Sequence, residues 1–526
     1  MERWLPPAET TCQEDHLLKR LTKVRKLFAF LRLHRLEIFD EAMQDQLVAM
    51  YRDTGAGLPP CPPAQLAMAT LLQGYVRASD AEAVELCVVD LRWQMVLGCI
   101  GSGEPPFCQN TLQQFRERAI AHDMDRVLLE HVVALARSSG AADAKLAGKA
   151  VRTAFDSRPL TGAGRVEDTI NLLGHAARRV AEIAARLLDT TVDEVCRRAR
   201  TPLLAGSSIK ASLDVDWSQP EEKQKAVEQV EQTVVRLTKW VREELERSMV
   251  EEPLQPYIEA MLEVRAQDLH RDEEGHLEVL REVAKSRRIS IEDAEMRHGR
   301  KSKSHRVNGY KEHVARDLDL PLILACEVRP ANEPEYEAAA SLKHDIERQG
   351  LTLRELSIDL GYAASPVVGQ VQAAGGEVVA KPWPSRPAAP GLFAKTAFTM
   401  DFERATLTCP AGQQVPLVLG EVASFAAPRC LRCPLRPKCT RAKNGRTVSI
   451  ARDEPEQVRR RRAVATVAGR ARCRERVQVE HALAHVAARK GPRARFIGCR
   501  RNLFDLRRAA TLQNLEAMQR ELPLAA

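Results

Sequence analysis

The sequence lacks the segments that place a protein in a membrane or direct it to secretion. No run of about 18 or more apolar residues occurs, so no transmembrane helix is expected. The opening residues Met1–Pro7 lack the apolar core of a signal peptide. The 13 cysteines are scattered over 526 residues and do not form a compact disulfide framework, which favours reduced thiols and a cytoplasmic location.

A large overall charge is also missing, but the charge is unevenly distributed. The formal net charge is only +8, whereas residues 451–526 hold 18 Lys and Arg against 8 Asp and Glu. Such a basic segment fits contact with a phosphate backbone, and an arginine-rich helix exposed to solvent has the same composition. The length exceeds what one hydrophobic core usually holds, which predicts about two to four domains.

Three acidic residues stand in distinctive settings. Asp156 follows the β-prone run Val151–Phe155 and Asp359 follows the mixed run Leu351–Ile358, so we expect both at the ends of strands. Glu480 lies in a helical stretch that is dense in arginine. Both aspartates have apolar neighbours, among which a carboxylate is costly unless it is paired or bound to a metal.

Carboxylates that converge from strand ends and a facing helix suit Mg²⁺, which binds a few of them and keeps waters for a phosphate substrate. Two such ions about 4 Å apart activate a water or a 3′ hydroxyl and stabilise the leaving oxygen in phosphodiester chemistry. The simpler interpretation is that the three are ordinary solvated acids, because the chain holds 71 Asp and Glu. Four other acids have similar settings: Asp214, Asp216, Glu167 and Asp168.

Five short motifs are spaced through the chain. They are Phe155-Asp-Ser-Arg-Pro-Leu-Thr-Gly-Ala-Gly-Arg-Val-Glu-Asp-Thr, Asn308-Gly-Tyr-Lys-Glu-His, Pro330-Ala-Asn, Asp359-Leu-Gly-Tyr and Arg476-x3-Glu480. Their order is that of DDE transposases of bacterial insertion sequences, and the chain resembles this family from about Leu66 to Asn514. The stretch Leu204–Trp217 looks like the subgroup whose catalytic core is interrupted by a long helical insertion.

The resemblance implies an α/β fold with an RNase H-like core, which is a mixed five-stranded sheet with helices on both faces. An N-terminal all-α domain, an α-helical insertion and a small Cys-containing insertion would surround it. In the family one acid ends the first strand, one ends the fourth strand and a glutamate lies on a late helix. Asp156, Asp359 and Glu480 match these positions, which implies that they are the catalytic residues and the ligands of Mg²⁺ or Mn²⁺. Asp214 and Asp216 then become structural or accessory residues of the insertion.

The implied function is transposition. Such an enzyme binds double-stranded DNA at the terminal inverted repeats of its element, cleaves the strand and joins the freed 3′ hydroxyl to target DNA. A synaptic complex holds two DNA ends, so a homodimer is expected, in the bacterial cytoplasm and associated with the nucleoid when bound to DNA. The alternatives are a catalytically inactive DNA-binding protein derived from a transposase, and an RNase H-like nuclease that cuts without joining.

The chain departs from the family at two positions near the late glutamate. Transposases that form DNA hairpins carry a tyrosine three residues before the arginine of this helix, where this chain has Cys473. They also place a lysine seven residues after the glutamate, where this chain has Ala487, with Arg489 and Lys490 just beyond. The departures put a hairpin pathway in doubt and leave the acid chemistry untouched.

The motifs and composition divide the chain into six segments. We expect a helical DNA-binding domain over 1–145, the first core strand over 146–169, a helical insertion over 170–295, the continued core with Asp359 over 296–375, a Cys-rich insertion over 376–455 and the C-terminal core helices with Glu480 over 456–526.

Residues 1–145 have the periodicity of several helices with basic faces. One apolar stripe consists of Leu17, Leu18, Leu21, Val24, Leu27, Phe28 and Leu31. A Pro-rich break over 58–63 separates it from a helix expected over 64–77, and another helix should start near Asn110 or Thr111. These helices fit a helix-turn-helix DNA reader or an ordinary bundle. The resemblance favours a domain that binds the terminal repeats.

Two middle segments have contrasting patterns. Helical spacing recurs over 180–188, 226–245 and 257–269, which predicts an α-helical insertion. Residues 296–313 are basic, with Arg297, Arg300, Lys301, Lys303, Arg306 and Lys311 against a single acid, Glu312. This second segment fits a flexible basic approach to the scissile phosphates or a solvated loop, and a strand should follow over 320–328.

Four cysteines after Asp359 have the spacing of a metal knuckle: Cys409, Cys430, Cys433 and Cys439. Thiolates two residues apart grip one tetrahedral ion, and two more complete a four-cysteine Zn²⁺ site without an open position for catalysis. An iron–sulfur cluster and free thiols are the alternatives. A structural metal would stabilise a β-rich subdomain beside the active site.

The Glu480 helix carries most of the predicted DNA contacts. Arg476 is one turn before Glu480, on the same face, where it could orient the carboxylate or hold a phosphate. His481 and His485 could be metal ligands but fit a polar helix face better. A closing helix is expected over 503–518, packed on the core near Asn514. The full set of expected DNA-binding residues is Arg476, Lys311, Arg300, Lys301, Arg489, Lys490, Arg493 and Arg495.

Overall fold

The computed structural model describes the chain except residues 1, 22–24, 53–60, 139–147, 207, 246–252, 274, 276, 281–283, 285, 302–303, 386 and 522–526. Val24, Lys303 and the expected domain boundary at residue 145 fall outside the described residues.

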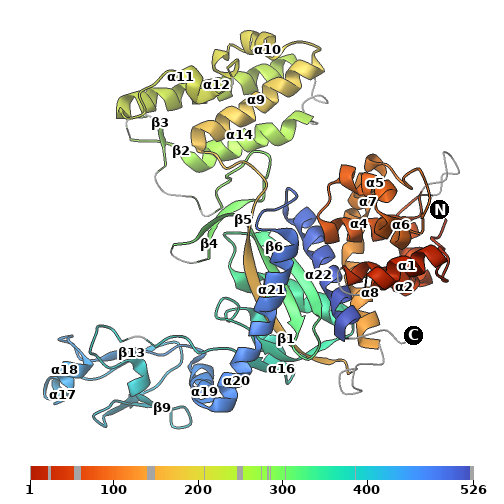
Figure 1. The fold of residues 1–526 in the computed structure, drawn as a ribbon. Coiled ribbons are helices and arrows are strands. Elements are labelled where there is room, and N and C mark those ends of the chain that lie inside the picture. Colours follow the sequence, from red (N-terminus) through yellow and green to blue (C-terminus); the bar gives the residue numbers. More distant parts are fainter. Residues whose placement is uncertain are drawn as a thin grey trace.

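The N-terminal region is helical, as the periodicity predicts (Figure 1). Its helices are α1 (Cys12–Arg20), α2 (Lys26–Ile38), α3 (Glu41–Val48), α4 (Pro63–Val76), α5 (Asp80–Val89), α6 (Leu91–Leu97), α7 (Gln109–Ala121) and α8 (Met124–Ser138). The predicted helix over 64–77 is α4, and the apolar stripe is divided between α1 and α2. Helix α7 starts one residue earlier than predicted because its N-cap is Cys108.

The central sheet is mixed. It contains β1 (Ala150–Thr161), β4 (Arg297–Arg300), β5 (Arg306–Asp317), β6 (Ile323–Pro330), β7 (Thr352–Ser357) and β8 (Glu377–Val379). Strand β5 is antiparallel to β1, β7 is parallel to β1 and β8 is parallel to β7. The far edge of β5 is shared, because β4 pairs with its first residues and β6 with the rest. The core order is therefore β6-β5-β1-β7-β8, with β4 as a short sixth strand.

The expectation that Asp156 closes its strand is wrong, because β1 runs on to Thr161. Its pairing with β7 ends at Ala154, whereas its pairing with β5 continues to Thr161 opposite Gly309. Beyond Ala154 one edge of β1 is therefore free of a strand partner, which allows Pro159 to lie in the strand without breaking a ladder bond. Asp156 lies at the point where the parallel neighbour ends.

The basic segment 296–313 is also not a loop where it is described. It forms β4 and the first half of β5, which pair with each other. Basic residues such as Arg306 are exposed, whereas Val307 and Tyr310 between them are buried, so the strand hides its apolar side in the sheet. The many basic residues of this segment made the alternation of buried and exposed positions hard to recognise in the sequence.

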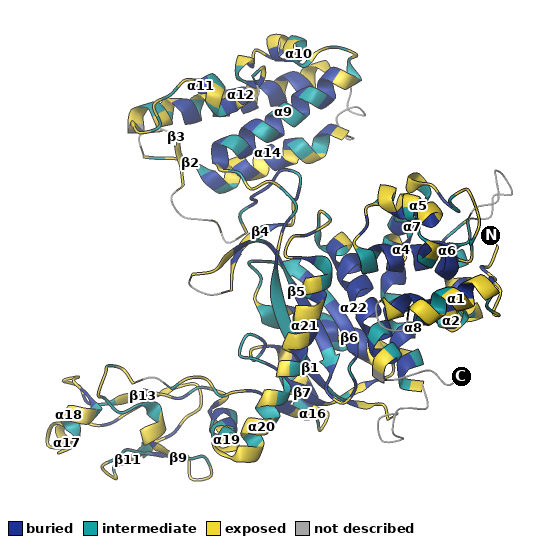
Figure 2. Cartoon of the chain, in the orientation of Figure 1, coloured by how far each residue is buried: buried dark blue, intermediate teal, exposed yellow. Residues whose placement is uncertain are grey.

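Helices cover both faces of the sheet. They are α15 (Ala339–Arg348) after the short helix η3 (Glu335–Ala338), α16 (Pro366–Ala373), α19 (Glu454–Ala465), α20 (Val467–Glu475), α21 (Val477–Lys490) and α22 (Cys499–Glu521). Phe155 and Leu356 join a core with α15, α16 and the N-terminal helices, whereas Val314 and Leu160 join a core with α21 and α22 (Figure 2). The closing helix α22 packs on β6, where the side chain of Asn514 exchanges two hydrogen bonds with the backbone of Ile323.

The helical insertion has its own hydrophobic core. It contains α9 (Thr169–Leu187), α10 (Val192–Arg198), η1 (Pro202–Leu204), α11 (Ile209–Leu213), α12 (Pro220–Glu244), α14 (Gln255–Asp268) and a small hairpin of β2 (Leu269–Arg271) and β3 (Leu277–Val279). Its entry and exit lie side by side, because Glu167 N–H donates to the carbonyl of Ile289. Asp214 ends α11 and Asp216 accepts hydrogen bonds from Ser218, so both are structural residues of the insertion.

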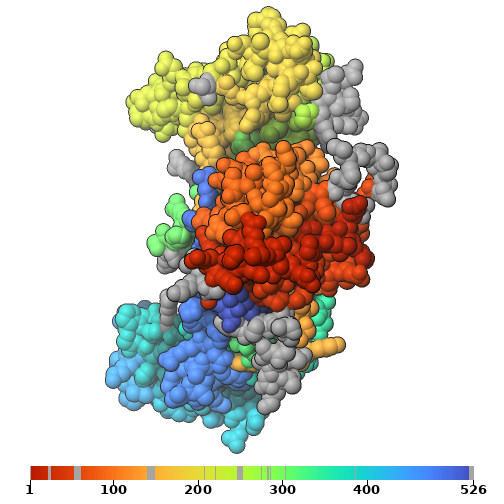
Figure 3. Space-filling model, turned by 45° about the vertical axis from the view of Figure 1, so that its right-hand side comes forward, coloured from red at the N-terminus to blue at the C-terminus, as the bar shows by residue number. Residues whose placement is uncertain are grey.

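The Cys-rich segment is built from short elements. They are η4 (Lys395–Ala397), β9 (Thr399–Asp401), β10 (Thr406–Thr408), β11 (Gln414–Pro416), β12 (Val422–Ser424), α17 (Ala427–Leu431), α18 (Arg436–Cys439) and β13 (Thr447–Ser449). Strand β8 lies inside the expected range 376–455 but belongs to the central sheet. Figure 3 shows the N-terminal helices forming one face between the insertion and the C-terminal half. Among the described helices, none combines the length and hydropathy needed to cross a bilayer.

A histidine holds the insertion to the two segments that connect it to the core. His175 of α9 contacts Glu167 through Nδ1 at 2.7 Å and Glu292 through Nε2 at 2.8 Å. Hydrogen bonds from these two carboxylates raise the pKa of His175 from 6.5 to about 9. Because the folded pKa lies above the unfolded one, this stabilisation is complete below pH 6.5 and is lost as the pH rises through about 9.

We therefore expect His175→Gln to remove part of the pH dependence of stability between pH 6.5 and 9. The wild type should exceed the variant in thermal midpoint most at the acid end of this window, and the difference should shrink toward its alkaline end. Thermal unfolding of both proteins at several pH values measures the difference. A constant difference across the window would contradict a charged His175.

Candidate active site

The strand register places two of the predicted acids side by side. The last β1–β7 pair is Ala154 with Ser357, and Asp156 and Asp359 each lie two residues further along their chains. Because the two strands are parallel, residues that lie two positions beyond paired residues are at the same level along the sheet edge. Asp359 is held there by Gly361, whose backbone N–H donates to Oδ1 at 2.9 Å.

Ion pairs fix the helix that carries the third acid. The buried carboxylate of Glu355 on β7 accepts from Arg152 on β1 at 3.0 Å and from Arg472 on α20 at 2.6 Å. Arg152 also pairs with Glu475 at the end of α20. A carboxylate buried in this way needs both partners, so the end of α20 is held on the sheet. Glu480 follows in the first turn of α21.

Arg476 joins two of the predicted acids. Its Nη2 lies 2.6 Å from Glu480 Oε1 and its Nη1 lies 3.2 Å from Asp156 Oδ2. This confirms the predicted contact between Arg476 and Glu480 at i, i+4 spacing. The Asp156 side chain is 15% exposed and that of Glu480 is 45% exposed. Asp156 and Glu480 therefore meet at one guanidinium, with Asp156 inside and Glu480 at the rim, and the charge of Asp359 acts on Asp156.

The carboxylates of the cluster lie close enough together for their negative charges to affect one another. Burial raises the pKa of Asp156 to about 6, Arg476 acts against the rise, and the charges of Asp359 and Glu480 add to it. Beneath the acids, Tyr362 and His313 are buried, and Tyr362 Oη lies 2.6 Å from His313 Nδ1. Burial lowers the pKa of His313 to about 3, so this imidazole is neutral and packs as part of the core.

The donor set suits a hard divalent cation. Three carboxylates that repel one another, one of them with its pKa raised, gain most from a small ion with oxygen preference. Across the described part of the chain, no three His, Cys, Asp or Glu side chains are arranged closely enough to hold a metal without movement. Arg476 accounts for this at the acid cluster, because its guanidinium lies against both Asp156 and Glu480.

A basic groove lies along β4 and β5. Arg300 and Lys311, both predicted to bind DNA, line an open groove of about 820 Å³ together with Arg297 and Arg306. The same two residues and Lys301 line a smaller hollow that reaches Ser157, the residue after Asp156. Basic side chains of β4 and β5 therefore surround spaces that extend to the neighbour of the first acid in the sequence.

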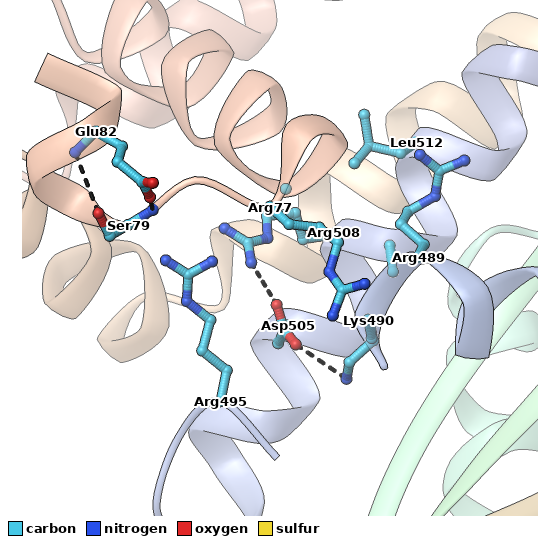
Figure 4. Close-up of a pocket in the computed structure, with 11 residues that line it drawn as sticks. Arg77, Ser79, Glu82, Arg489, Lys490, Arg495, Asp505, Arg508 and Leu512 are labelled. Atoms are coloured by element: carbon cyan, nitrogen blue, oxygen red, sulfur yellow. Dashed lines mark hydrogen bonds and ion pairs between the residues drawn. The ribbon is translucent and has the colours of Figure 1, made fainter. Parts of the chain in front are cut away.

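The other predicted DNA contacts lie elsewhere. Arg489 is nine residues after Glu480, about two and a half helical turns, and so faces the opposite side of α21. Arg489, Lys490 and Arg495 line a cavity of about 390 Å³ between α4, α21 and α22, together with Arg77 and Arg508 (Figure 4). Residue Arg493 is exposed and donates to the carbonyl of Ala163.

Within this cavity several cations are already paired with acids. The ammonium of Lys490, with a side chain only 4% exposed, contacts the buried Glu312 and lies 3.2 Å from Asp505. Burial raises the pKa of Asp505, but Lys490 and Arg508 outweigh it and hold that pKa below its ordinary value. Arg489 pairs with Glu516 at 2.7 Å. Lys490 therefore has the environment of an internal structural charge.

The four predicted cysteine ligands come together. Cys409 follows β10, Cys430 lies on α17, Cys433 follows it and Cys439 ends α18, and all four line one cavity of about 20 Å³. A space of this size admits about one water-sized atom. All four are free thiols, and desolvation together with the charges of the other three raises the pKa of Cys439, which Arg446 opposes. His481 and His485 are exposed on α21, as a polar face predicts.

Sequence reasoning missed one residue of the acid cluster, Glu335. Glu335 at the start of η3 accepts a hydrogen bond from Ser157 Oγ at 2.6 Å, beside Asp156. The charge of Glu335 also acts on Tyr362, together with those of Asp156 and Asp359. The available signal was the motif Pro330-Ala-Asn, which marks the turn before Glu335, but no spacing rule links that turn to the strand ends.

Comparison with known proteins gives two family matches. Residues 408–519 match the family described as transposase DDE domain, and residues 13–118 match the transposase domain DUF772. The first match contains the four cysteines and Glu480. The second extends from α1 through most of α7. No curated protein and no solved structure matches the chain.

The burial of Lys490 predicts a stability effect. Lys490→Met should lower the free energy of unfolding by about 3–5 kcal/mol, because Glu312 and Asp505 would remain buried without their shared cation. Urea denaturation measures the change, with the exposed Arg493→Met as the matched control, for which less than about 0.5 kcal/mol is expected. A stable Lys490→Met protein with weakened DNA binding would assign Lys490 to the DNA interface.

Proposed function

Because the chain is a DDE transposase of an insertion sequence, we propose that it binds the terminal inverted repeats of its element, cleaves the DNA strand and joins the freed 3′ hydroxyl to target DNA. The observation that carries the proposal is the convergence of Asp156, Asp359 and Glu480 from three distant segments. An inactive DNA-binding protein would not require this convergence.

The sheet supports an RNase H-like core as part of the proposal. Its order β6-β5-β1-β7-β8 combines an antiparallel first half with a parallel second half, and the two aspartates come from the central β1 and its parallel neighbour β7. Ligand sites in open α/β sheets gather at the carboxyl ends of parallel strands, and the β1–β7 pair meets that rule.

The residues have distinct roles in the proposed reaction. Transposases of this family generally use divalent metal ions, and Asp156, Asp359 and Glu480 would hold Mg²⁺ or Mn²⁺, which activates the attacking oxygen and stabilises the leaving one. Asp156 is fixed by its strand and Asp359 by the Gly361 N–H, so both present their oxygens in set positions. Arg476 pairs with two acids and would exchange one of them for a phosphate oxygen of the DNA.

The groove supplies the DNA contacts of the proposal. Arg300, Lys301 and Lys311 would hold the backbone phosphates beside the acids, in a channel whose charge is not cancelled by nearby carboxylates along β4. Arg493 and Arg495 would contact DNA outside the catalytic centre. Strand transfer requires that the two DNA ends of the element are brought together, so we propose a homodimer in the synaptic complex. This complex would act in the compartment that contains the DNA.

The Cys-rich segment has a separate proposed role. Cys409, Cys430, Cys433 and Cys439 would hold one structural Zn²⁺, because all four thiols line one atom-sized cavity. The segment has a small hydrophobic core of its own, which includes Phe398, Leu407 and Phe425, and small scaffolds of this kind are often stabilised further by a metal. The metal would stabilise the fold and take no part in catalysis.

Removing any catalytic acid should abolish the reaction and spare DNA binding. We expect Asp156→Asn, Asp359→Asn and Glu480→Gln each to reduce excision and strand transfer of a mini-element by at least about 100-fold, with the Kd for the end DNA changed less than about threefold. Plasmid excision, strand-transfer product and electrophoretic mobility shift measure these three quantities.

The matched control is Asp214→Asn, an acid of the insertion whose left-handed backbone conformation (φ 45°) asparagine also adopts. It should be as active as the wild type. Cleavage without joined product would instead identify a nuclease, and specific end binding by a wild type that never cleaves would identify an inactive DNA-binding protein.

The zinc proposal predicts the metal content of the purified protein. Wild-type protein purified without chelators should contain about one Zn²⁺ per chain by atomic emission, and Cys430→Ser or Cys433→Ser should lose most of it and become sensitive to proteolysis within 390–450. Cys12→Ser, at an exposed cysteine outside the cavity, is the control. A metal-free wild type that resists proteolysis would contradict the proposal.

A further inference from the structure

Glu335 is the fourth carboxylate near the catalytic acids. It begins η3, five residues after β6 ends, and the intervening turn brings it to Ser157 of β1. Ser157 Oγ donates to Glu335 Oε1 at 2.6 Å, and Ser157 is the residue after Asp156. One oxygen of Glu335 is thus attached to the strand position that presents the first catalytic acid.

The second oxygen of Glu335 lies over the turn that presents Asp359. A Cβ atom at Gly361 would collide with Glu335 Oε2 and would lie 3.1 Å from Asp359 Oδ1. The Glu335 carboxylate thus occupies the space that a side chain at position 361 would take, and would have to move if one were introduced. Glu335 contacts both turns that carry the catalytic aspartates.

The charge of Glu335 has no basic partner at ion-pair distance within the described chain. Glu335 accepts a hydrogen bond from the hydroxyl of Ser157 and lies against the backbone of the Gly361 turn, while Lys311 donates from its ammonium to the carbonyl of Glu333 at 2.7 Å. Burial lowers the pKa of Lys311 and the charges of Glu335 and Glu333 raise it, which places the ammonium near both acids.

A purely structural role would not need this charge. Ser157 Oγ would donate equally well to the amide oxygen of a glutamine, which has nearly the same shape. A negative charge at Glu335 would add to the repulsion among Asp156 and Asp359, which a cation bound at the cluster would relieve. The three acids already described fit such a cation.

We propose that Glu335 is a positioning residue of the catalytic centre, which sets the separation of Asp156 and Asp359 through Ser157 and Gly361 and adds negative charge that strengthens divalent-cation binding there. This inference rests on the proposed function, because it presumes that the acids bind such a cation.

The test measures Mn²⁺ binding to the full-length protein by electron paramagnetic resonance, without DNA and without turnover. Glu335→Gln keeps the hydrogen-bond acceptor and removes the charge, and should weaken Mn²⁺ binding about 10- to 100-fold while leaving the thermal midpoint and the Kd for end DNA unchanged. Glu335→Asp keeps the charge and should bind Mn²⁺ more tightly than Glu335→Gln. Glu333→Gln, two residues away and directed at Arg329, is the matched control and should bind as the wild type does.

The outcomes separate this inference from the proposed function. Loss of Mn²⁺ in Asp156→Asn with wild-type affinity in Glu335→Gln overturns the role of Glu335 and leaves the proposed function standing. A wild type that binds no Mn²⁺ overturns both. If Glu335→Gln unfolds, Ser157→Ala takes its place: it keeps every charge and removes the tether, and weakened Mn²⁺ binding with a normal thermal midpoint supports the positioning role, whereas unchanged binding overturns it.

Discussion

The parallel pairing of β1 with β7 is the constraint on which the rest of the site depends. A register that ends at Ala154 and Ser357 brings Asp156 and Asp359 to one level of the sheet, whatever lies between them in sequence. Shifting this register by one residue would turn one aspartate to the opposite face, because side chains alternate along a strand. The repulsion between the two acids opposes the pairing, and burial of Phe155, Leu356 and Ile358 beside them offsets it.

The third acid depends on a different kind of interaction. Glu355 on β7 is buried and is satisfied only when Arg152 on β1 and Arg472 on α20 both reach it, so the two strands and the helix before Glu480 are fixed together. In the same core, the side chain of Asn514 on α22 makes hydrogen bonds with the backbone N–H and C=O of the buried Ile323 on β6. The long insertions disturb neither contact, because the helical one leaves and returns at adjacent points beside Glu167 and Ile289.

Local features of the sequence predict the helices and strands and several side-chain contacts, whereas contacts between distant segments cannot be predicted from them. Apolar periodicity predicts α4 and the insertion helices, and helical spacing predicts the contact of Arg476 with Glu480. The length of β1 could not be predicted, because Pro159 is tolerated only where β7 has already ended. Lys490 was assigned to DNA from its place in a basic run, and only the fold reveals Glu312 and Asp505 beside it. Glu335 was missed for the same reason, since Ser157 is 178 residues away.

The acids of this site differ in freedom, and that difference follows from how each is held. Asp156 is a short side chain on a paired strand and Asp359 is bound to the Gly361 N–H, so neither can move far without breaking backbone contacts. Glu480 has a longer side chain, 45% exposed at the start of a helix, and its contact is a single pair with Arg476. Exposed pairs of this kind are weak, about 0–1 kcal/mol. A rigid pair and an adjustable third carboxylate would allow the spacing of the cluster to change in the proposed reaction while the sheet stays fixed, and Arg476, which pairs with Asp156 and Glu480, would then exchange partners.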